Sequence, residues 1–291
     1  MKNIEENLYV TFTMDCERIK KFSPPGGPET WELSERAIKG YTRTLTEYGF
    51  KCTFFIVPET AYKHRELFLQ TLDRGFELGM HYHPQSFLDG RYTKYLGEYS
   101  YEEQLKQLSQ AFDYWKDAIG FKPESFRPGN ASSNEYTYKV IYKLGFKQAS
   151  TYIPNRNIPR FHAVYLDVNP YPHHVSGMNL FEVPMTSDIR VRPPVDRDPP
   201  HLRIEWGRLE KLTNIVDFWV EHLVESNVSV KSIVVLTHNF IDYLNERSKH
   251  SIRLRGLIKH IINVTKSFNL ELVPVTIKEL HEIVDKCGIN V

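Results

Sequence analysis

The alternation of short apolar runs with amphipathic segments is the feature that most constrains the fold of this chain. Apolar runs at 8–14, 52–57 and 76–83 predict buried strands. Between them, and again after Ser100, apolar residues recur at spacings of three and four, which is typical of one face of a helix. Strands and helices that alternate at this spacing predict a parallel sheet, either closed as an α/β barrel or open and doubly wound.

The alternation stops in the middle of the chain and then resumes. Nine of the seventeen prolines fall between Pro154 and Pro200, so we expect residues 151–207 to form short strands joined by long, proline-stiffened loops. Helical and strand patterns return from Leu209 onward. Long loops over a barrel commonly shape a binding site. We therefore expect a single α/β domain over 1–291, with this segment as an excursion of loops.

Composition excludes several classes of partner. With 37 basic and 36 acidic residues the net charge is +1, and there is no basic block to bind nucleic acid or an anionic membrane. No stretch approaches the ~20 apolar residues of a membrane-spanning helix, and residues 1–12 lack the apolar segment of a signal peptide. Cys16, Cys52 and Cys287 form no CxxC pair. We expect a soluble cytoplasmic protein without membrane insertion, whose oligomeric state the sequence does not specify.

Four groups of polar residues come where predicted strands end. They are Asp15 with Glu17, His81 with His83, Arg127, and His238. The carboxyl ends of the strands form the active-site face of parallel α/β barrels. Each group alone is weak evidence, because turn carboxylates, loop histidines and surface arginines have ordinary structural roles. Their common placement at strand ends is what indicates a site.

His81 and His83 are two residues apart, and side chains at this spacing on an extended chain point to the same side. Two imidazoles and one carboxylate can hold a divalent metal and leave positions open for water and substrate. A second carboxylate can then act as base, a histidine opposite can protonate the leaving group, and an arginine can keep the base ionised. Together these groups predict metal-assisted hydrolysis of an amide or ester.

Five motifs are spread over about residues 8 to 280, namely VTFTMDCE, ELGMHYHP, FRPGNASSNEYTYKVIYKLGFKQAS, LFEVP and VVLTHN. In the order and spacing of these motifs the sequence resembles the polysaccharide deacetylase superfamily (NodB homology, carbohydrate esterase family four). The resemblance implies a distorted (β/α)7 barrel. It also implies removal of N- or O-acetyl groups from sugars with one divalent metal, most often zinc.

Matched motif by motif, the resemblance implies a role for the residues of the first two groups. Asp15 corresponds to the base and Glu17 to a metal ligand, although these two roles are open to exchange. His81 corresponds to the first metal-binding histidine. Gln85 stands where the second histidine is usual in the family, which leaves His83 as the second ligand.

The same match extends to the later motifs. Arg127 corresponds to the arginine that pairs with the base, and His238 to the general-acid histidine. The acid that orients this histidine has no clear counterpart, and the candidates are Asp167, Glu182 and Asp188. Three further residues are expected to contact substrate from loops, namely Asn130, His173 and His174.

We therefore expect a metal-dependent deacetylase acting on an acetylated sugar or glycan. The expected cytoplasmic location favours an internal substrate, such as a nucleotide-linked or lipid-linked sugar of surface polysaccharide or lipopolysaccharide biosynthesis. Two alternatives stay open. One is hydrolysis of a non-sugar amide C–N bond, as in relatives that act on cyclic amides or ureides. The other is a non-catalytic, deacetylase-like glycan-binding barrel, which the glutamine at position 85 favours.

Overall fold

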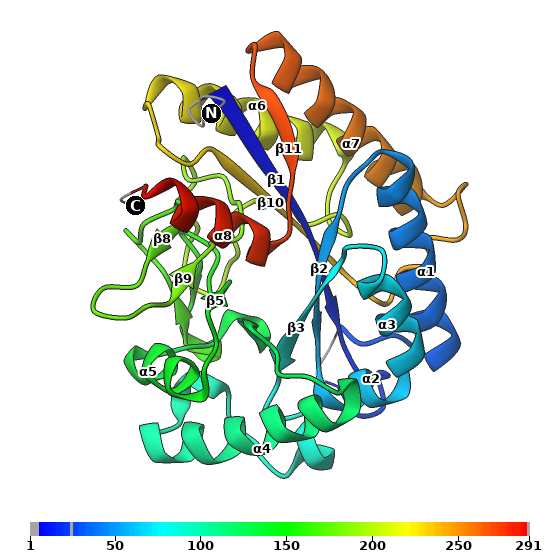
Figure 1. The fold of residues 1–291 in the computed structure, drawn as a ribbon, viewed down its shortest axis with the longest axis vertical. Coiled ribbons are helices and arrows are strands. Elements are labelled where there is room, and N and C mark those ends of the chain that lie inside the picture. The colour runs from blue at the N-terminus through cyan, green and yellow to red at the C-terminus, as the bar shows by residue number, and fades with distance from the viewer. Residues whose placement is uncertain (1–5, 24–25, 290–291) are drawn as a thin grey trace.

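The computed structural model describes residues 6–23 and 26–289, and its elements follow the predicted alternation (Figure 1). The strands are β1 Asn7–Cys16, β2 Cys52–Ile56, β3 Glu77–Tyr82, β4 Ser125–Pro128, β5 Gln148–Ala149, β6 Asn157–Ile158, β7 Ala163–Val164, β8 His173–His174, β9 Phe181–Glu182, β10 Ser232–His238 and β11 Glu271–Pro274. The helices are α1 Trp31–Glu47, α2 Pro58–Lys63, α3 Arg65–Leu72, α4 Tyr101–Ile119, α5 Glu135–Leu144, α6 Leu209–Glu225, α7 Lys249–Ser267 and α8 Ile277–Cys287.

Local signals set the helix ends. At the start of α4 the hydroxyl of Ser100 accepts from the N–H of Glu103 at 3.3 Å, and the Glu103 carboxylate accepts from the N–H of Ser100 at 2.9 Å. This reciprocal pair satisfies two backbone donors that the helix itself leaves free. At the end of α5, Gly145 has a φ of 93°, a left-handed conformation that glycine adopts without steric cost. None of the helices in the two described ranges is long and apolar enough to cross a lipid bilayer.

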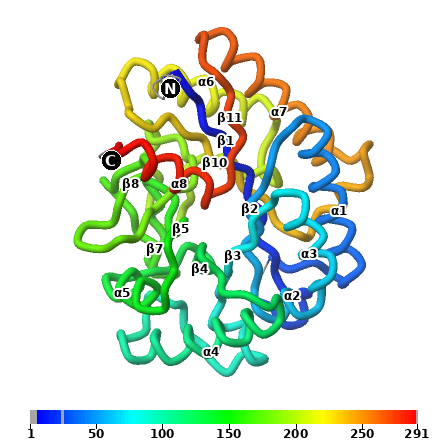
Figure 2. The backbone as a smooth tube through the Cα atoms, viewed as in Figure 1, coloured from blue at the N-terminus to red at the C-terminus, as the bar shows by residue number. Residues whose placement is uncertain are grey.

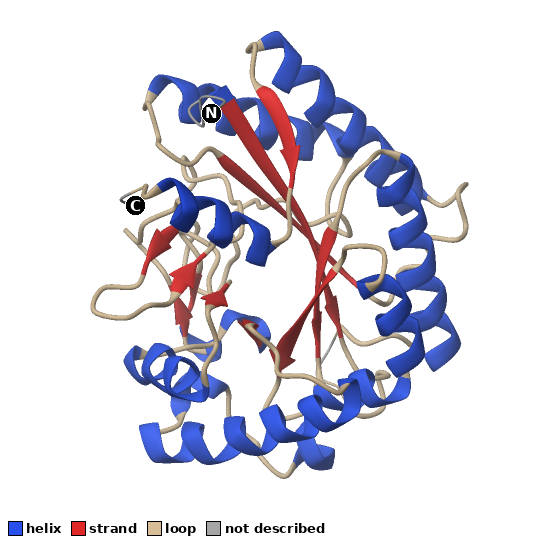
Figure 3. Cartoon of the chain, viewed as in Figure 1, coloured by secondary structure: helices blue, strands red, loops and turns tan. Residues whose placement is uncertain are grey.

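A curled sheet forms the centre of the molecule, with helices on its outer side (Figure 3). The strand order is β10–β1–β2–β3–β4–β5–β9–β8, and the neighbours run parallel except for the antiparallel pair β8–β9. β11 also pairs with β1 in parallel, over residues 7–10, and β2 pairs with residues 12–16. The expected single-domain α/β fold, a distorted barrel of parallel strands, is confirmed.

The proline-rich excursion contributes to the barrel wall. As expected, it contains only short strands joined by loops, of which β6 and β7 form a separate antiparallel pair. Backbone hydrogen bonds then run from the excursion to β10: the N–H of Leu236 donates to Leu202 at 2.8 Å, and the N–H of Ile204 donates to Leu236 at 3.0 Å. Residues 202–204 thus lie along the free side of β10, and the following residues reach the carboxyl end of that strand.

The two faces of β1 show how the barrel separates core from site. Successive side chains of a strand alternate between its faces. Phe12 and Met14 pack into the main apolar cluster shared with the outer helices. Thr13 and Asp15 point the other way, into the barrel, where both contact Arg127. Because both faces are covered, the strand is buried along nearly its whole length and appears in the sequence as a continuous apolar run.

Candidate active site

The six polar residues expected at strand ends line one pocket at the carboxyl end of the parallel strands. Sheet register brings them together, because Asp15 on β1 lies opposite His238 on β10, and His81 on β3 lies opposite Arg127 on β4. The pocket has a volume of about 70 Å³ and a largely polar lining. The arrangement is the one that the strand-end placement predicted.

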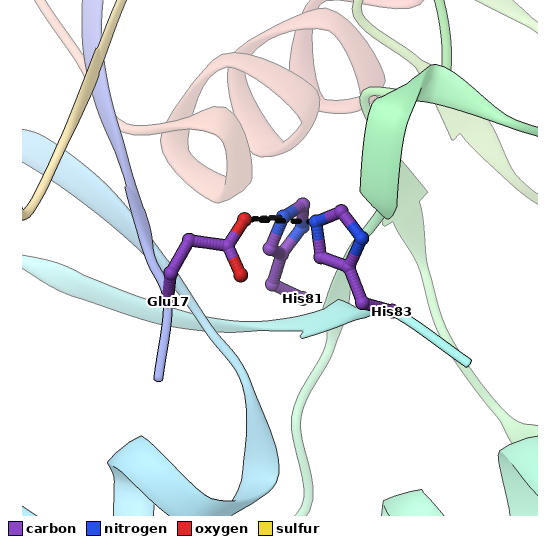
Figure 4. A group of neighbouring side chains, drawn as sticks. All are labelled: Glu17, His81 and His83. Atoms are coloured by element: carbon purple, nitrogen blue, oxygen red, sulfur yellow. Dashed lines mark hydrogen bonds and ion pairs between the residues drawn. The ribbon is translucent and has the colours of Figure 1, made fainter. Parts of the chain in front are cut away.

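Glu17 and the two histidines point at one another inside this pocket (Figure 4). Oε1 of Glu17 lies 3.2 Å from Nε2 of His81 and 2.8 Å from Nε2 of His83. Nδ1–H of His81 donates to the carbonyl oxygen of Arg127 at 2.9 Å, so in the neutral ring Nε2 presents its lone pair to the carboxylate. Two imidazoles and a carboxylate that converge in this way, with an outer hydrogen bond on one ring, fit a divalent metal.

The surroundings hold these three side chains in position. The N–H of Glu17 donates to Oδ1 of Asn239, and Nδ2 of Asn239 donates back to the carbonyl oxygen of Glu17, both at 2.9 Å. Gly129 leaves room for the ring of His83, because a Cβ at this position would overlap it. Burial would raise the pKa of Glu17, but the neighbouring His83 and His81 outweigh burial and lower it well below its usual value. Glu17 is therefore ionised and could offer a charged oxygen to a cation.

Asp15 lies between the three potential ligands and His238. Its Oδ1 accepts from Nη1 of Arg127 at 2.7 Å, and its Oδ2 lies 3.9 Å from Nε2 of both His81 and His238. Burial would raise the pKa of Asp15, but the charges of Arg127, His81 and His238 together lower it below its usual value. Asp15 is therefore ionised, and it lies farther from Nε2 of His81 than the 3.2 Å that separates Glu17 from this nitrogen.

Arg127 is held from several sides at once. It is 1% exposed, and besides Asp15 it donates to the hydroxyls of Thr13 and Ser150, both at 2.9 Å. Its guanidinium lies over the ring of Phe55, 4.2 Å from the ring centre, which adds a cation–π contact. The arginine thus has one orientation, and it fixes the carboxylate of Asp15 in turn.

The sequence did not identify Glu205, and the structure shows it beside His238. Nδ1–H of His238 donates to Oε1 of Glu205 at 3.0 Å, and Nε of Arg203 donates to Oε2 at 3.2 Å. Burial would raise the pKa of Glu205, but Arg203 and His238 lower it to about 2. An ionised carboxylate on Nδ1 fixes the ring so that Nε2 faces Asp15.

The three acids that were candidates for this contact lie elsewhere, so that expectation was wrong. Asp167 and Asp188 form ion pairs with arginines of the excursion. Glu182 on β9 accepts a hydrogen bond from the N–H of Thr151 at 2.7 Å. Burial raises the pKa of Glu182 to about 7.

A local pattern in the sequence could have identified Glu205. In HLRIEW, Leu202 and Ile204 alternate with Arg203 and Glu205, which is the two-residue period of a strand. The structure buries the two apolar side chains in the core, and Arg203 donates to Glu205 on the other face. The segment is too short and too close to prolines for this period to stand out by itself.

Of the three residues expected to contact substrate, Asn130 lines the pocket, whereas His173 and His174 do not. The two histidines form β8, the last strand in the sheet order, which pairs only with β9 among the described strands. Nδ1–H of His173 donates to the carbonyl oxygen of Tyr171 at 2.9 Å. The expectation that these histidines contact substrate is corrected, because the antiparallel turn carries them to the edge of the sheet.

The excursion supplies the opposite wall of the pocket. Arg156, Asp198, His201 and Arg203 line it, and Nε of Arg156 lies 2.8 Å from Oδ1 of Asp198. Burial lowers the pKa of His201 to about 4, so this ring is neutral at neutral pH. Groups of a substrate that extend away from Asp15 would meet these residues, which come from the part of the chain with the least regular structure.

Barrel and site together define an α/β-barrel protein with a potential metal-binding and acid–base site at its strand ends. The polysaccharide deacetylase family model matches residues 27–149, the part of the chain from α1 to β5. The resemblance to the polysaccharide deacetylase superfamily is thereby confirmed. This match supports a hydrolase acting on acetylated carbohydrates. No protein of curated function matches the sequence.

Solved structures share the fold over nearly the whole chain. A putative polysaccharide deacetylase from Mycobacterium smegmatis is 16% identical with a TM-score of 0.65, over 98% of this chain and 93% of the other. A probable polysaccharide deacetylase from Pseudomonas aeruginosa PAO1 is 12% identical with a TM-score of 0.64, over 97% and 92%. The Puue allantoinase is 12% identical with a TM-score of 0.64, over 97% and 91%. At such identities the likeness establishes the fold alone.

Proposed function

We propose that this chain is a metal-dependent deacetylase that hydrolyses an N-acetyl or O-acetyl group of a sugar. One observation carries the proposal: Glu17, His81 and His83 converge on one point, and Asp15 lies between that point and His238. A metal-ligand set, an ionised base and an oriented histidine within one pocket form a complete apparatus for acyl hydrolysis.

Each residue of the pocket has a chemical task in this reaction. A divalent ion held by Glu17, His81 and His83, with zinc the best match to two nitrogens and one oxygen, would polarise the acyl oxygen and acidify water. Asp15, kept ionised by Arg127, accepts the proton of the attacking water. His238 in its protonated form donates from Nε2 to the leaving nitrogen or oxygen.

The substrate that we propose is a small acetylated sugar, nucleotide-linked or lipid-linked, of surface polysaccharide or lipopolysaccharide assembly in the cytoplasm. The pocket of about 70 Å³ favours a substrate of which only a short portion, such as the acetyl group, enters it. The wall of the pocket that residues 151–207 supply carries Arg156 and Arg203, which suit hydroxyl and anionic groups of the substrate beyond its acetyl group. The buried, unpaired thiols of Cys16 and Cys52 suit a reducing compartment.

A second candidate is hydrolysis of a non-sugar amide. The fold of the Puue allantoinase matches this chain with a TM-score of 0.64, against 0.65 and 0.64 for the two deacetylases. The same apparatus would cleave a cyclic amide, and the residues of the excursion would then select the ring in place of a sugar.

The two candidates can be separated by metal analysis and a substrate panel. We expect tag-free protein to contain zinc, to lose hydrolysis on treatment with a chelator and to regain it with zinc. The panel comprises N-acetylglucosamine oligomers, UDP-N-acetylglucosamine, O-acetylated xylan and allantoin. Acetate release from a sugar supports deacetylation, whereas cleavage of allantoin alone supports the second candidate. Sugar binding without acetate release, in zinc-loaded protein, would contradict both and indicate a glycan-binding barrel.

The contact between Glu205 and His238 leads to a prediction of its own. We expect Glu205→Gln to lower kcat/KM about 10- to 100-fold and to leave zinc content unchanged, because an amide no longer enforces the orientation and charge of His238. Steady-state kinetics across pH would measure the change. Glu182→Gln is the matched control, a fully buried carboxyl outside the pocket, and should keep wild-type kcat/KM. A Glu205→Gln variant with the kcat/KM and pH profile of the wild type would contradict the role of Glu205 in orienting His238.

A further inference from the structure

A second cluster of metal-ligating side chains lies at the edge of the sheet, between β8 and α8. Figures 1 and 2 show the backbone of these two elements. His174 comes from β8, while His281 and Asp285 are one turn apart on α8. One ligand atom of each lies within 4.8 Å of the other two. We propose that His174, His281 and Asp285 form a second transition-metal site, which takes zinc and ties the last helix to the edge of the sheet.

The distances within the cluster suit such an ion. Oδ1 of Asp285 lies 3.5 Å from Nε2 of His174, and Oδ2 lies 3.3 Å from Nε2 of His281. Ligand atoms about 2.0–2.2 Å from a tetrahedral zinc are about 3.3–3.5 Å from one another. Both distances have this spacing, although each involves a different oxygen of Asp285. One ligand atom from each residue lies within 4.8 Å of the other two, and His174 and Asp285 are partly exposed, so small rotations of their side chains can bring one carboxylate oxygen and both imidazole nitrogens around one ion.

His281 is the pre-positioned ligand of the cluster. Its Nδ1–H donates to Oε1 of Gln148 at 3.0 Å, so in the neutral ring Nε2 carries the lone pair. The ring stacks on Phe181 with a centroid distance of 4.8 Å and an interplanar angle of 4°. Its side chain is only 9% exposed, and among the described residues its buried Nε2 has no hydrogen-bond partner. A ring fixed by an outer hydrogen bond, with a free lone pair facing a carboxylate, is typical of a metal ligand.

The ligand types indicate which ions the site selects. Two imidazoles and one carboxylate favour zinc and its late transition-metal neighbours over magnesium or calcium, which prefer oxygen ligands. The side chain of Asp285 is 49% exposed, so water can complete the coordination from the solvent side. A metal ion coordinated by both His174 and the two α8 residues would join the proline-rich excursion to the last helix, on the side where the parallel sheet ends.

The experiment separates this site from the active-site pocket, with which it shares no residue. Tag-free, metal-stripped full-length protein carrying His81→Ala and His83→Ala would be titrated with zinc by calorimetry, and its thermal unfolding followed with and without zinc. We expect this background to bind one equivalent of zinc and to unfold at a higher temperature when zinc is present. Adding His174→Ala and Asp285→Asn should weaken zinc binding at least tenfold and remove the thermal shift.

His173→Ala in the same background is the matched control. His173 is the neighbouring histidine of β8 and is half-buried like His174, but it is not part of the cluster, so zinc binding should persist. Glu17→Gln offers a second background if loss of two buried histidines prevents folding, and circular dichroism of metal-free proteins verifies the fold. A folded background that binds no zinc, or a His174/Asp285 variant that binds it unchanged, would overturn the proposal. Hydrolysis is not a readout here, so failure of this site leaves the proposed function standing.

Discussion

Asp15→Asn is expected to lower kcat/KM by about 10²- to 10⁴-fold, the usual contribution of a general base, while zinc stays bound. The amide keeps the shape of Asp15 and still accepts from Arg127, but it cannot take a proton from water. Zinc should remain because Glu17 is 3.2 Å from Nε2 of His81, whereas Asp15 is 3.9 Å away. Kinetics and metal content of the purified variant would be measured together.

Two further variants test whether Asp15 or Glu17 holds the metal and whether the loss of activity is specific to the pocket. Glu17→Gln should lose both zinc and activity, because a neutral amide replaces the charged carboxylate that lies beside both histidine rings. Asp188→Asn is the matched control: Asp188 is 8% exposed against 5% for Asp15, but it does not line the pocket, so activity should be unchanged. Loss of zinc in Asp15→Asn with retention in Glu17→Gln would exchange the two roles.

Arg127→Met is expected to lower the free energy of unfolding by about 3–5 kcal/mol, the cost of leaving one member of a buried ion pair alone. Arg127 is 1% exposed and Asp15 is 5% exposed, so water cannot replace the missing partner. Urea denaturation of metal-free protein would measure the change. Arg160→Met is the control, because its ion pair with Asp196 spans 3.7 Å between exposed side chains and should contribute less than about 1 kcal/mol.

The loss of unfolding free energy in Arg127→Met should also depend on pH. In the wild type the pKa of Asp15 is lowered, so its contribution to stability is present above the unfolded-state value of about 3.9 and is lost as pH falls through the folded value. Without the arginine, burial raises the folded pKa of Asp15. The deficit should then grow as pH rises above about 4.

A double variant tests whether the unpaired charge causes this deficit. Asp15→Asn combined with Arg127→Met removes the buried charge that the single arginine variant leaves behind. The double variant should therefore be less destabilised than the sum of the two single variants. The ion-pair account would be contradicted if Arg127→Met lost the same unfolding free energy at low and neutral pH and if the losses of the two single variants added up to that of the double variant.

Much of this architecture could be predicted because its signals are local. The central strands are covered on both faces, so β1 appears as a continuous apolar run, and the helices show their buried face at spacings of three and four. The expected site residues followed from the same strands. Asp15, His81, Arg127 and His238 each end a parallel strand, and parallel strands end on the same side of a barrel.

The excursion could not be predicted in the same way, because its contacts are long-range. Glu205 reaches His238 through backbone pairing between residues 202–204 and β10, more than thirty positions further along the chain. His174 was expected in the pocket, but the antiparallel pairing of β8 with β9 carries it to Asp285 on α8. No local period or spacing in the sequence indicates the contact between Glu205 and His238 or the one between His174 and Asp285.

By itself, then, the sequence determined a parallel α/β fold and the strand ends that carry its chemistry, while its resemblance to the deacetylase superfamily implied the barrel and the potential ligand set of Glu17, His81 and His83. The parallel fold and the placement at strand ends depend on the side-chain period within single strands, and on the rule that parallel strands share one active end. Only the tertiary structure decided which acid orients His238, which residues wall the pocket, and that His174 faces the last helix. Those contacts depend on how distant segments pair, and pairing is set by packing of the whole chain.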